Sequence, residues 1–425
     1  MRHAGAIIGA LGLIASLALA ATFSGSQRAL AQDAEAASVE LVISGPVIEA
    51  EETRSAFIYV RPEVPEAYRG NSASAGILAQ GWSLLGREDL GAAAGSDEYA
   101  PRPNETPNVV ATGIEATLDA IAKRASDARV VIINESHEVT LHRDFSRRVI
   151  ERLRPLGFTV LAAETFNNQK DKPDPVEESA HLPYPRVQDG YYLLEPVFGE
   201  MVRTAKRLGY RLAAYEQVYD PDRTNPGPDE DWRQSIKDRE TAQAQHLAQL
   251  LKSMAPHEKL IVHAGYGHAN EEARIGKDGW DDAWMAARLK RDHGFDPLTI
   301  AQTKSRGSAD TVQLFLPSDK LAKQFDLIVD HPIHGFRHGR SDWRFSDEAR
   351  AVDIPQPYAS AAEPLVIEAF AAGEPFEAVP VDRVWVEPGE DVKLALKPGR
   401  YIVRAVRPVL APLSSPEPQT PATPE

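Results

Sequence analysis

The feature that most constrains the fold is a strand–helix unit that recurs between residues 129 and 301. Short apolar runs typical of strands alternate there with longer amphipathic runs typical of helices. The strand-type runs are apolar through most of their length, as expected of strands buried on both faces. The predicted strands are 129–134, 158–163, 210–215, 259–263 and 298–301, and the predicted helices are 140–156, 196–208, 231–254 and 283–293. This alternation predicts an α/β fold with a mostly parallel sheet and helices on both of its faces.

Glycines mark the ends of three of these helices. Gly157, Gly209 and Gly294 each stand where a helix C-terminus needs a positive φ, and a strand follows at once. The recurrence indicates one αβ unit that is repeated along the chain.

The sequences on either side of this region predict further β structure. Residues 312–316 and 325–330 are expected to add strands to the same sheet, and four β-type runs after residue 360 predict a small C-terminal antiparallel β unit. Strands are also expected at 39–44 and 56–60, followed by a connector rich in Gly, Ala and Ser. The predicted units are a signal peptide at 1–31, an N-terminal β-containing segment and linker at 32–108, an α/β catalytic-type domain at 109–345, a β-rich C-terminal unit at 346–410 and a disordered tail at 411–425.

The first 31 residues have the three parts of a secretory signal peptide. Arg2 and His3 give a basic start, residues 6–21 are apolar, and Ala29-Leu30-Ala31 forms a small-residue cleavage site. The apolar stretch is shorter than the ~20 residues that span a membrane. We therefore expect cleavage, a secreted or periplasmic location, and no membrane span in the mature chain.

Cysteine content and charge exclude several classes of function. The chain has no cysteine, which excludes a disulfide framework, thiolate metal sites and a cysteine nucleophile. Its formal net charge of −15 becomes more negative when the signal peptide is removed with Arg2 and Arg28. Because such a surface repels phosphate groups, nucleic acid is not expected as a partner.

Polar side chains stand at the ends of all five predicted strands. The carboxyl ends of parallel strands meet at one edge of a sheet, so these groups are expected to converge on one cleft. In chain order they are Glu135 with His137, Glu164, Glu216, His263 with His268, and Gln302.

This residue set suits the activation of water or the binding of a metal. A glutamate beside a histidine can orient the imidazole and increase its basicity, or both can ligate a divalent cation. His137 or His263 is the candidate general base, although His263 is equally well explained as a core histidine. Glu135 and Glu164 are candidates to orient the base or, with His137 and His268, to hold a metal. His268 follows a Gly-Tyr-Gly turn whose amides can approach a developing oxyanion.

Two further features bear on a catalytic reading. Arg239 lies on the predicted helix 231–254, where it either pairs with an active-site carboxylate, receives a substrate anion or belongs to a solvated face. Tyr191 and Tyr192 belong to a long Pro-rich connection of the kind that often covers active sites.

The sequence has no Gly-x-Ser-x-Gly, Walker-type, dinucleotide-binding or His-Glu-x-x-His motif. Water activated by Glu and His, with or without a metal, is the chemistry that remains.

Four short motifs, taken in order, resemble the erythromycin esterase-like and ChaN-like superfamily. They lie between residues 129 and 303, which is under half of the chain. The resemblance implies a cleft with this residue set. It leaves the activity open, because the superfamily includes metal-free ester hydrolysis, metal-dependent proteolysis and haem binding. The motifs are Asn134-Glu-Ser-His137, Ala162-Ala-Glu164, Asp238-Arg-Glu240 and Val262-His-Ala-Gly-Tyr-Gly-His268.

Three functions are therefore expected as alternatives. The leading hypothesis is an exported hydrolase of an ester or amide bond in a small molecule or a peptide. The second is a non-enzymatic envelope protein that binds haem or a metal through imidazoles and Tyr266. The third is a scaffold whose β-rich flanks bind a cell-envelope partner.

Overall fold

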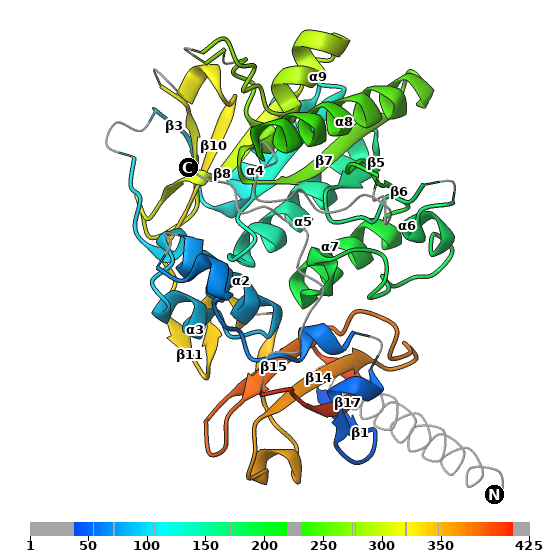
Figure 1. The fold of residues 1–425 in the computed structure, drawn as a ribbon, viewed down its shortest axis with the longest axis vertical. Helices are drawn as coiled ribbons and strands as arrows, with labels where there is room; N and C mark the ends of the chain where they lie inside the picture. Colours follow the sequence, from blue (N-terminus) through cyan, green and yellow to red (C-terminus); the bar gives the residue numbers. More distant parts are fainter. Residues whose placement is uncertain are drawn as a thin grey trace, which may run out of the picture.

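The computed structural model describes residues 38–410 except for 54, 71–72, 105–107, 171, 219–231, 274, 277, 319–320 and 347. A helix-covered sheet and a smaller second sheet lie one above the other along the long axis of the molecule (Figure 1). The predicted signal peptide at 1–31 and the predicted tail at 411–425 lie outside the described residues. Within the described ranges, none of the helices combines the length and the hydrophobicity that crossing a bilayer requires.

The larger sheet has eight strands, most of them parallel. From β10 to β6 every neighbouring pair is parallel, whereas β9 pairs antiparallel with both β3 and β10. This confirms the predicted mostly parallel sheet. Its order is β3 (Asn108–Thr112), β9 (Gln313–Leu316), β10 (Leu327–His331), β8 (Leu298–Arg306), β4 (Val130–Glu135), β7 (Lys259–Gly265), β5 (Phe158–Ala163) and β6 (Arg211–Ala213).

Helices cover both faces of this sheet because its strands send apolar side chains alternately into two cores. In β4, Val131 and Ile133 belong to one core, whereas Val130 and Ile132 belong to the other. Each core needs its own helical layer, as predicted. The first core contains residues of α4 (Ile114–Ala125), α5 (Leu141–Leu153) and α7 (Pro196–Arg207), and the second contains residues of α8 (Trp232–Ser253) and α9 (Met285–His293).

The elements predicted for this region are present, with shifts at their ends. Glycine ends a helix with φ of 89° at Gly157 and 74° at Gly294, as expected of left-handed C-caps. The strands β7 and β8 continue beyond their predicted ends to Gly265 and Arg306. As a consequence Gln302, which was expected to follow a strand, lies inside β8.

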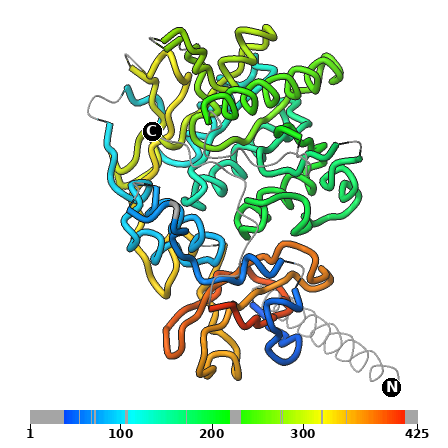
Figure 2. The backbone as a smooth tube through the Cα atoms, viewed as in Figure 1, coloured from blue at the N-terminus to red at the C-terminus, as the bar shows by residue number. Residues whose placement is uncertain are grey.

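The smaller sheet joins the two ends of the described chain. β14 runs antiparallel to β15 and β17, which confirms the predicted C-terminal antiparallel unit, whereas β1 and β2 run parallel to β17. Figure 2 shows the blue N-terminal segment lying against the orange and red C-terminal strands. The strands are β1 (Val39–Ile43), β17 (Gly399–Arg407), β14 (Leu365–Ala371) and β15 (Asp382–Val386) in sheet order, with β2 (Ile48–Glu49) also on β17. Two further antiparallel pairs accompany it. They are the hairpin of β11 (Phe336–Arg337) with β12 (Arg340–Ser341), and the pair of β13 (Arg350–Asp353) with β16 (Lys393–Leu396).

Two expectations for the N-terminal region are wrong. Residues 56–58 form a 3-10 turn rather than a strand. The expected connector contains two helices, α2 (Ala73–Leu84) and α3 (Glu88–Ala93), which lie between the two sheets (Figure 1). Trp82 of α2 packs edge-on against Trp385 of β15, with ring centroids 5.7 Å apart. Leu84 and Leu85 are buried in the same cluster, so the end of α2 is packed against the smaller sheet.

Candidate active site

The three central strands β4, β7 and β5 end at the same level of the sheet. Glu135 of β4 pairs with Gly265 of β7, and Ala163 of β5 pairs with His263 of β7. The backbone N–H of Glu164 then donates to the carbonyl of His263 at 3.0 Å. The carboxyl edge of the sheet therefore brings the two glutamates to neighbouring positions.

Glu135 is buried and is held by one arginine and one histidine. Arg143 of α5 donates to both carboxylate oxygens, from Nε to Oε2 at 2.8 Å and from Nη2 to Oε1 at 3.0 Å. The Nδ1 atom of His137 lies 2.9 Å from Oε1. Burial alone would raise the pKa of Glu135, but Arg143, His263 and the hydrogen bond with His137 hold that pKa well below its usual range. Glu135 is therefore an anion that orients His137 through Nδ1.

Arg143 is shared with a second buried carboxylate, that of Glu195. Its Nη1 atom donates to Oε2 of Glu195 at 3.2 Å. Glu195 caps α7 and accepts hydrogen bonds from the backbone N–H groups of Val197 and Phe198, both at 2.9 Å. Glu195 is therefore held by the start of α7 as well as by Arg143.

Glu164 is held by a different arginine and by the backbone of β7. Arg239 of α8 donates from Nη2 to Oε1 at 2.7 Å, and the N–H of Gly265 donates to Oε2 at 2.5 Å. Burial would raise the pKa of Glu164, but His268 and Arg239 hold it well below its usual range. Because the amide of Gly265 is used in this way, it does not serve as the oxyanion donor expected from the Gly-Tyr-Gly turn.

Two further carboxylates complete the group around Glu164. Glu216 accepts from Nε of Arg239 at 3.1 Å, and Glu240 lies 2.8 Å from Nδ1 of His268. The Nε2 atom of His268 lies 3.2 Å from Nη1 of Arg239 and 3.6 Å from Glu164. Burial lowers the pKa of His268, but Glu240 and Glu164 outweigh it and raise the pKa overall. Arg239 and His268 therefore both stand beside Glu164.

The His137 imidazole lies between the carboxylates of Glu135 and Glu164. A Cβ atom at Gly265 would come within 2.5 Å of Cε1 of His137 and within 3.1 Å of Oε2 of Glu164. Tyr192 stacks on the imidazole with 3.8 Å between centroids, and Tyr266 packs against it edge-on at 5.0 Å. The long connection before α7 thus contributes one of the walls that fix His137.

The centre is nearly closed to solvent. His137 and Glu164 are each 7 % exposed and His268 is 6 % exposed. The side chain of Arg239 is 20 % exposed, which is more than the side chains of Glu164 and His268. A substrate would therefore meet Arg239 before it meets the imidazoles.

His263 is placed differently from the other two histidines. It is buried with Phe198 edge-on at 5.1 Å, and its Nε2 atom lies 3.6 Å from Oε2 of Glu135 without a hydrogen-bond partner among the described residues. Burial lowers the pKa of His263 to about 4. Of the two candidate bases, His137 is the one that faces Glu164 across Gly265. His263 is a neutral core histidine behind Glu135.

Tyr266, the candidate haem contact, uses its hydroxyl within the protein. The oxygen lies 3.3 Å from Oγ of Ser136 and donates to Oε1 of Glu138 at 3.3 Å. Burial raises the pKa of Tyr266 well above its ordinary value. A tyrosine that ligates haem iron does so as an accessible phenolate, so this side chain does not fit that role.

The carboxylates do not fit a divalent cation either. Both oxygens of Glu135 and both oxygens of Glu164 already face donors. A bound cation would have to displace Arg143 or Arg239 and then lie beside its positive charge. Across the described ranges, no group of three or more His, Asp or Glu side chains is arranged to hold a metal ion. The four candidate metal ligands are paired within the protein instead.

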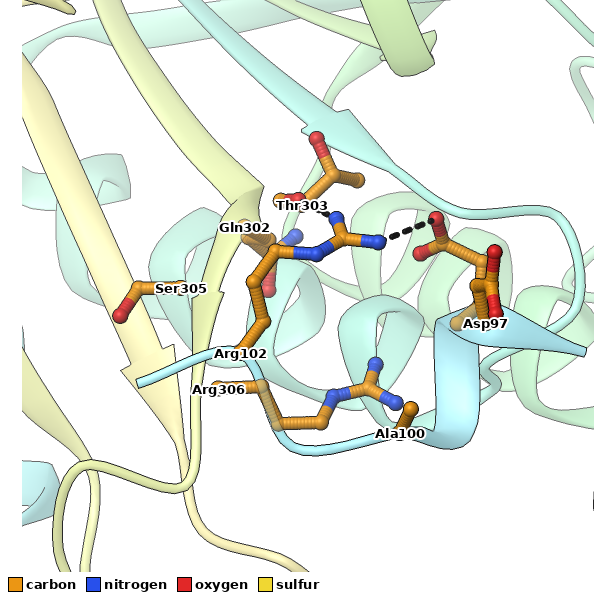
Figure 3. A pocket seen from close by; sticks show the side chains of 8 residues that line it. Asp97, Ala100, Arg102, Gln302, Thr303, Ser305 and Arg306 are labelled. Atoms are coloured by element: carbon orange, nitrogen blue, oxygen red, sulfur yellow. Dashed lines mark hydrogen bonds and ion pairs between the residues drawn. The ribbon is translucent and has the colours of Figure 1, made fainter. Parts of the chain in front are cut away.

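Gln302 belongs to a separate buried network. Its Nε2 atom donates to the carbonyl of Asn134 at 2.7 Å, and its Oε1 atom lies 2.9 Å from Nε2 of His331. It also lines a small pocket beside the end of β8, where Arg102 donates to the carbonyl of Thr303 (Figure 3). Gln302 therefore links strands rather than joining the Glu135 and Glu164 groups. The pocket is lined by Asp97, Glu98, Ala100, Arg102, Gln302, Thr303, Ser305 and Arg306.

Comparison with known proteins gives a likeness in structure only. No family model matches the sequence, and no curated protein is similar to it in sequence. In fold, the chain is similar to ChaN of Campylobacter jejuni. That structure, which shows cofacial haem binding to ChaN, has 8 % identity and a TM-score of 0.31, and the match covers 50 % of this chain and 90 % of ChaN.

Two effector proteins are similar to a comparable degree. The type III effector HopBA1 has 16 % identity and a TM-score of 0.36, with 55 % of this chain and 99 % of HopBA1 covered. RRSP, a MARTX toxin effector domain from Vibrio vulnificus CMCP6, has 15 % identity and a TM-score of 0.32, with 63 % of this chain and 48 % of RRSP covered. Likeness of this extent says nothing about chemistry, which rests on the side-chain geometry above.

Three residues that hold the centre together were not assigned a role from the sequence. Arg143 and Glu240 lie on helices, where a charged residue is usually solvated, and Glu195 lies before a helix. A signal existed for Glu195, because an acidic residue followed by Pro196 is typical of a helix start. Arg143 lies eight residues beyond Glu135 in the first turn of α5, which turns it back toward the strand end.

Proposed function

We propose that this protein is an exported hydrolase that cleaves an ester or amide bond of a small molecule or peptide, with water as the nucleophile. The observation that carries the proposal is the opposition of two groups across Gly265. On one side Glu135 orients His137, and on the other Arg239 and His268 stand beside Glu164. A base and a cationic group that face each other are what hydrolysis of a carbonyl compound requires.

Each group has one role in the proposed reaction. His137 takes a proton from water, whose oxygen attacks the carbonyl carbon, while Glu135 stabilises the imidazolium that forms. Arg239, together with His268, stabilises the negative charge that develops on the carbonyl oxygen. His137 then returns the proton to the departing alcohol or amine. Glu164 holds Arg239 and the backbone of Gly265 in place.

Export is proposed from the N-terminal sequence. Residues 1–31 carry the basic, apolar and small-residue parts of a signal peptide. Expression of the full chain followed by mass spectrometry of the exported protein tests this proposal. We expect an N-terminus at Gln32, and a product that keeps Met1 would contradict it.

Hydrolysis is tested with the full chain and a panel of chromogenic esters and amides. We expect His137→Gln to lower kcat/KM by about 10²-fold or more, since general-base catalysis contributes about 10²–10⁴. The buried His263 provides the comparison, and His263→Gln is expected to lower kcat/KM by less than about tenfold. Equal turnover of His137→Gln and the parent would end the assignment of His137 as the base.

A further inference from the structure

A line of buried charges runs from the proposed centre to the smaller sheet, and its role rests on the proposed function. Arg143 joins Glu135 to Glu195, as described above. Nη1 of Arg344 lies 3.9 Å from Oε1 of Glu195, and Nη2 of the same side chain donates to Oδ1 of Asp382 at 2.7 Å. Cations and anions therefore alternate without a break from the end of β4 to the first residue of β15.

The far end of this line is anchored firmly in the smaller sheet. Asp382 accepts from Nη2 of Arg340 at 2.7 Å and from Nη1 at 2.9 Å. It also accepts from the backbone N–H of Ala395 in β16 at 2.7 Å. Arg340 and Asp382 are buried, so Asp382 is fixed by four donors, of which Arg344 is one.

Burial makes each member of the line dependent on its neighbours. The side chains of Glu195 and Asp382 are 0 % exposed and that of Arg344 is 8 % exposed. A buried charge is stable only when an opposite charge compensates it. Glu195 has two such partners, Arg143 and Arg344. Without Arg344, Glu195 would keep the two amides at the start of α7, but it would compete with Glu135 for the guanidinium of Arg143.

We propose that Glu195, Arg344 and Asp382 are positioning residues for His137. By sharing Glu195, Arg344 leaves Arg143 free to hold both oxygens of Glu135, and Glu135 in turn fixes the Nδ1 side of His137. The smaller sheet is thereby part of the proposed hydrolytic centre, although none of its residues touches the imidazole in the contacts described.

The chain offers a matched control for this proposal. Arg203 of α7 also reaches the C-terminal part of the chain, where Nε donates to Oε1 of Glu374 at 3.0 Å. The side chain of Arg203 is 9 % exposed and that of Arg344 is 8 % exposed. Its ion pair therefore joins the same two parts of the molecule but does not involve Glu195.

The test is the imidazole N–H proton of His137 in the full chain labelled with ¹⁵N-histidine. The resonance is assigned by its absence from His137→Gln. We expect it to be present at pH 7 in the parent and in Arg203→Met, and to be lost to solvent exchange in Arg344→Met. Arg344→Lys keeps a positive charge between the two carboxylates and is expected to retain the resonance. Arg344→Gln replaces Arg344→Met if the latter fails to fold.

Two outcomes would overturn the proposal. One is a His137 resonance that is unchanged in Arg344→Met, and the other is equal loss in Arg344→Met and Arg203→Met, which would indicate general loosening between the sheets. The measurement needs no substrate, so it remains decisive if hydrolysis itself is not found. Where hydrolysis is found, Arg344→Met is expected to lower kcat by about tenfold with little change in KM.

Discussion

At the scale of single residues, Gly265 sets the distance between His137 and Glu164. A methyl group there would come within 2.6 Å of Nε2 of His137. We predict that Gly265→Ala lowers kcat/KM by about 10²-fold, because a displacement of about 1 Å can cost that much. Steady-state hydrolysis by the variant measures the effect.

The control for this variant is Gly91→Ala in α3. A Cβ atom at Gly91 would meet Ala79 at 3.1 Å, which is also tight, but the contact is between α3 and α2. Turnover of Gly91→Ala is expected to match the parent. Similar losses in both variants would show that crowding in general, and not contact with His137, causes the effect.

Glu138 gives a prediction about pH. Burial raises the pKa of Glu138 to about 7, against an unfolded value of 4.5. Folded protein therefore binds the proton more tightly, so the contribution of this group is fully present below pH 4.5 and is lost as the pH rises through 7. We predict that Glu138→Gln removes this loss. Between pH 4.5 and pH 8 the free energy of unfolding of the parent is expected to fall by about 2–3 kcal/mol relative to that of the variant. Urea titrations at the two pH values measure the difference, and parallel pH curves would contradict the prediction.

The sequence predicted the residues at strand ends better than the residues that hold them. Glu135, Glu164 and His268 come together because parallel strands share one edge, and that follows from chain order alone. The roles of Arg143 and Glu240 depend on which side of a helix faces the sheet. Charged residues on a helix face inward only when a buried partner compensates them, and the partner is distant in the sequence.

At the scale of elements, α2 is an anchored part of the fold and not a linker. Trp82 is 8 % exposed and packs against Trp385. We predict that Trp82→Ala lowers the free energy of unfolding by about 3–5 kcal/mol, as is typical of a large aromatic removed from a core. Urea unfolding measures the loss.

Phe57 serves as the control for Trp82, since it is also aromatic and N-terminal but is 51 % exposed. Phe57→Ala is expected to cost less than about 1 kcal/mol. Equal losses from the two substitutions would show that α2 is not anchored through Trp82.

The elements that were predicted wrongly share a cause. Residues 56–60 are apolar and partly β-branched, so they suggested a strand, but in the described part of the chain they form an isolated β-bridge, from Val60 to Val409. The α2 and α3 region is rich in small residues, which carry little periodic signal. The αβ repeats were predictable because each of their strands and helices buries an apolar surface that repeats with a fixed period.

At the scale of the whole molecule, the two sheets are expected to unfold together. The pairing of β1 with β17 ties N-terminal to C-terminal residues, and a buried ion pair with Glu368 of β14 holds Arg383 in the smaller sheet. Arg383 also donates to the carbonyls of Leu84 and Leu194, at 3.1 and 2.7 Å. We predict one calorimetric transition whose van't Hoff and calorimetric enthalpies agree. Two resolved transitions would show that the sheets unfold independently.

The central claim is that arginines, and not a metal ion, hold the two carboxylates that organise His137. The most direct test is elemental analysis of the purified mature protein together with its hydrolytic turnover after dialysis against a chelator. We predict substoichiometric metal and unchanged kcat/KM after dialysis. Loss of turnover on chelation, restored by one equivalent of a divalent metal, would contradict the claim.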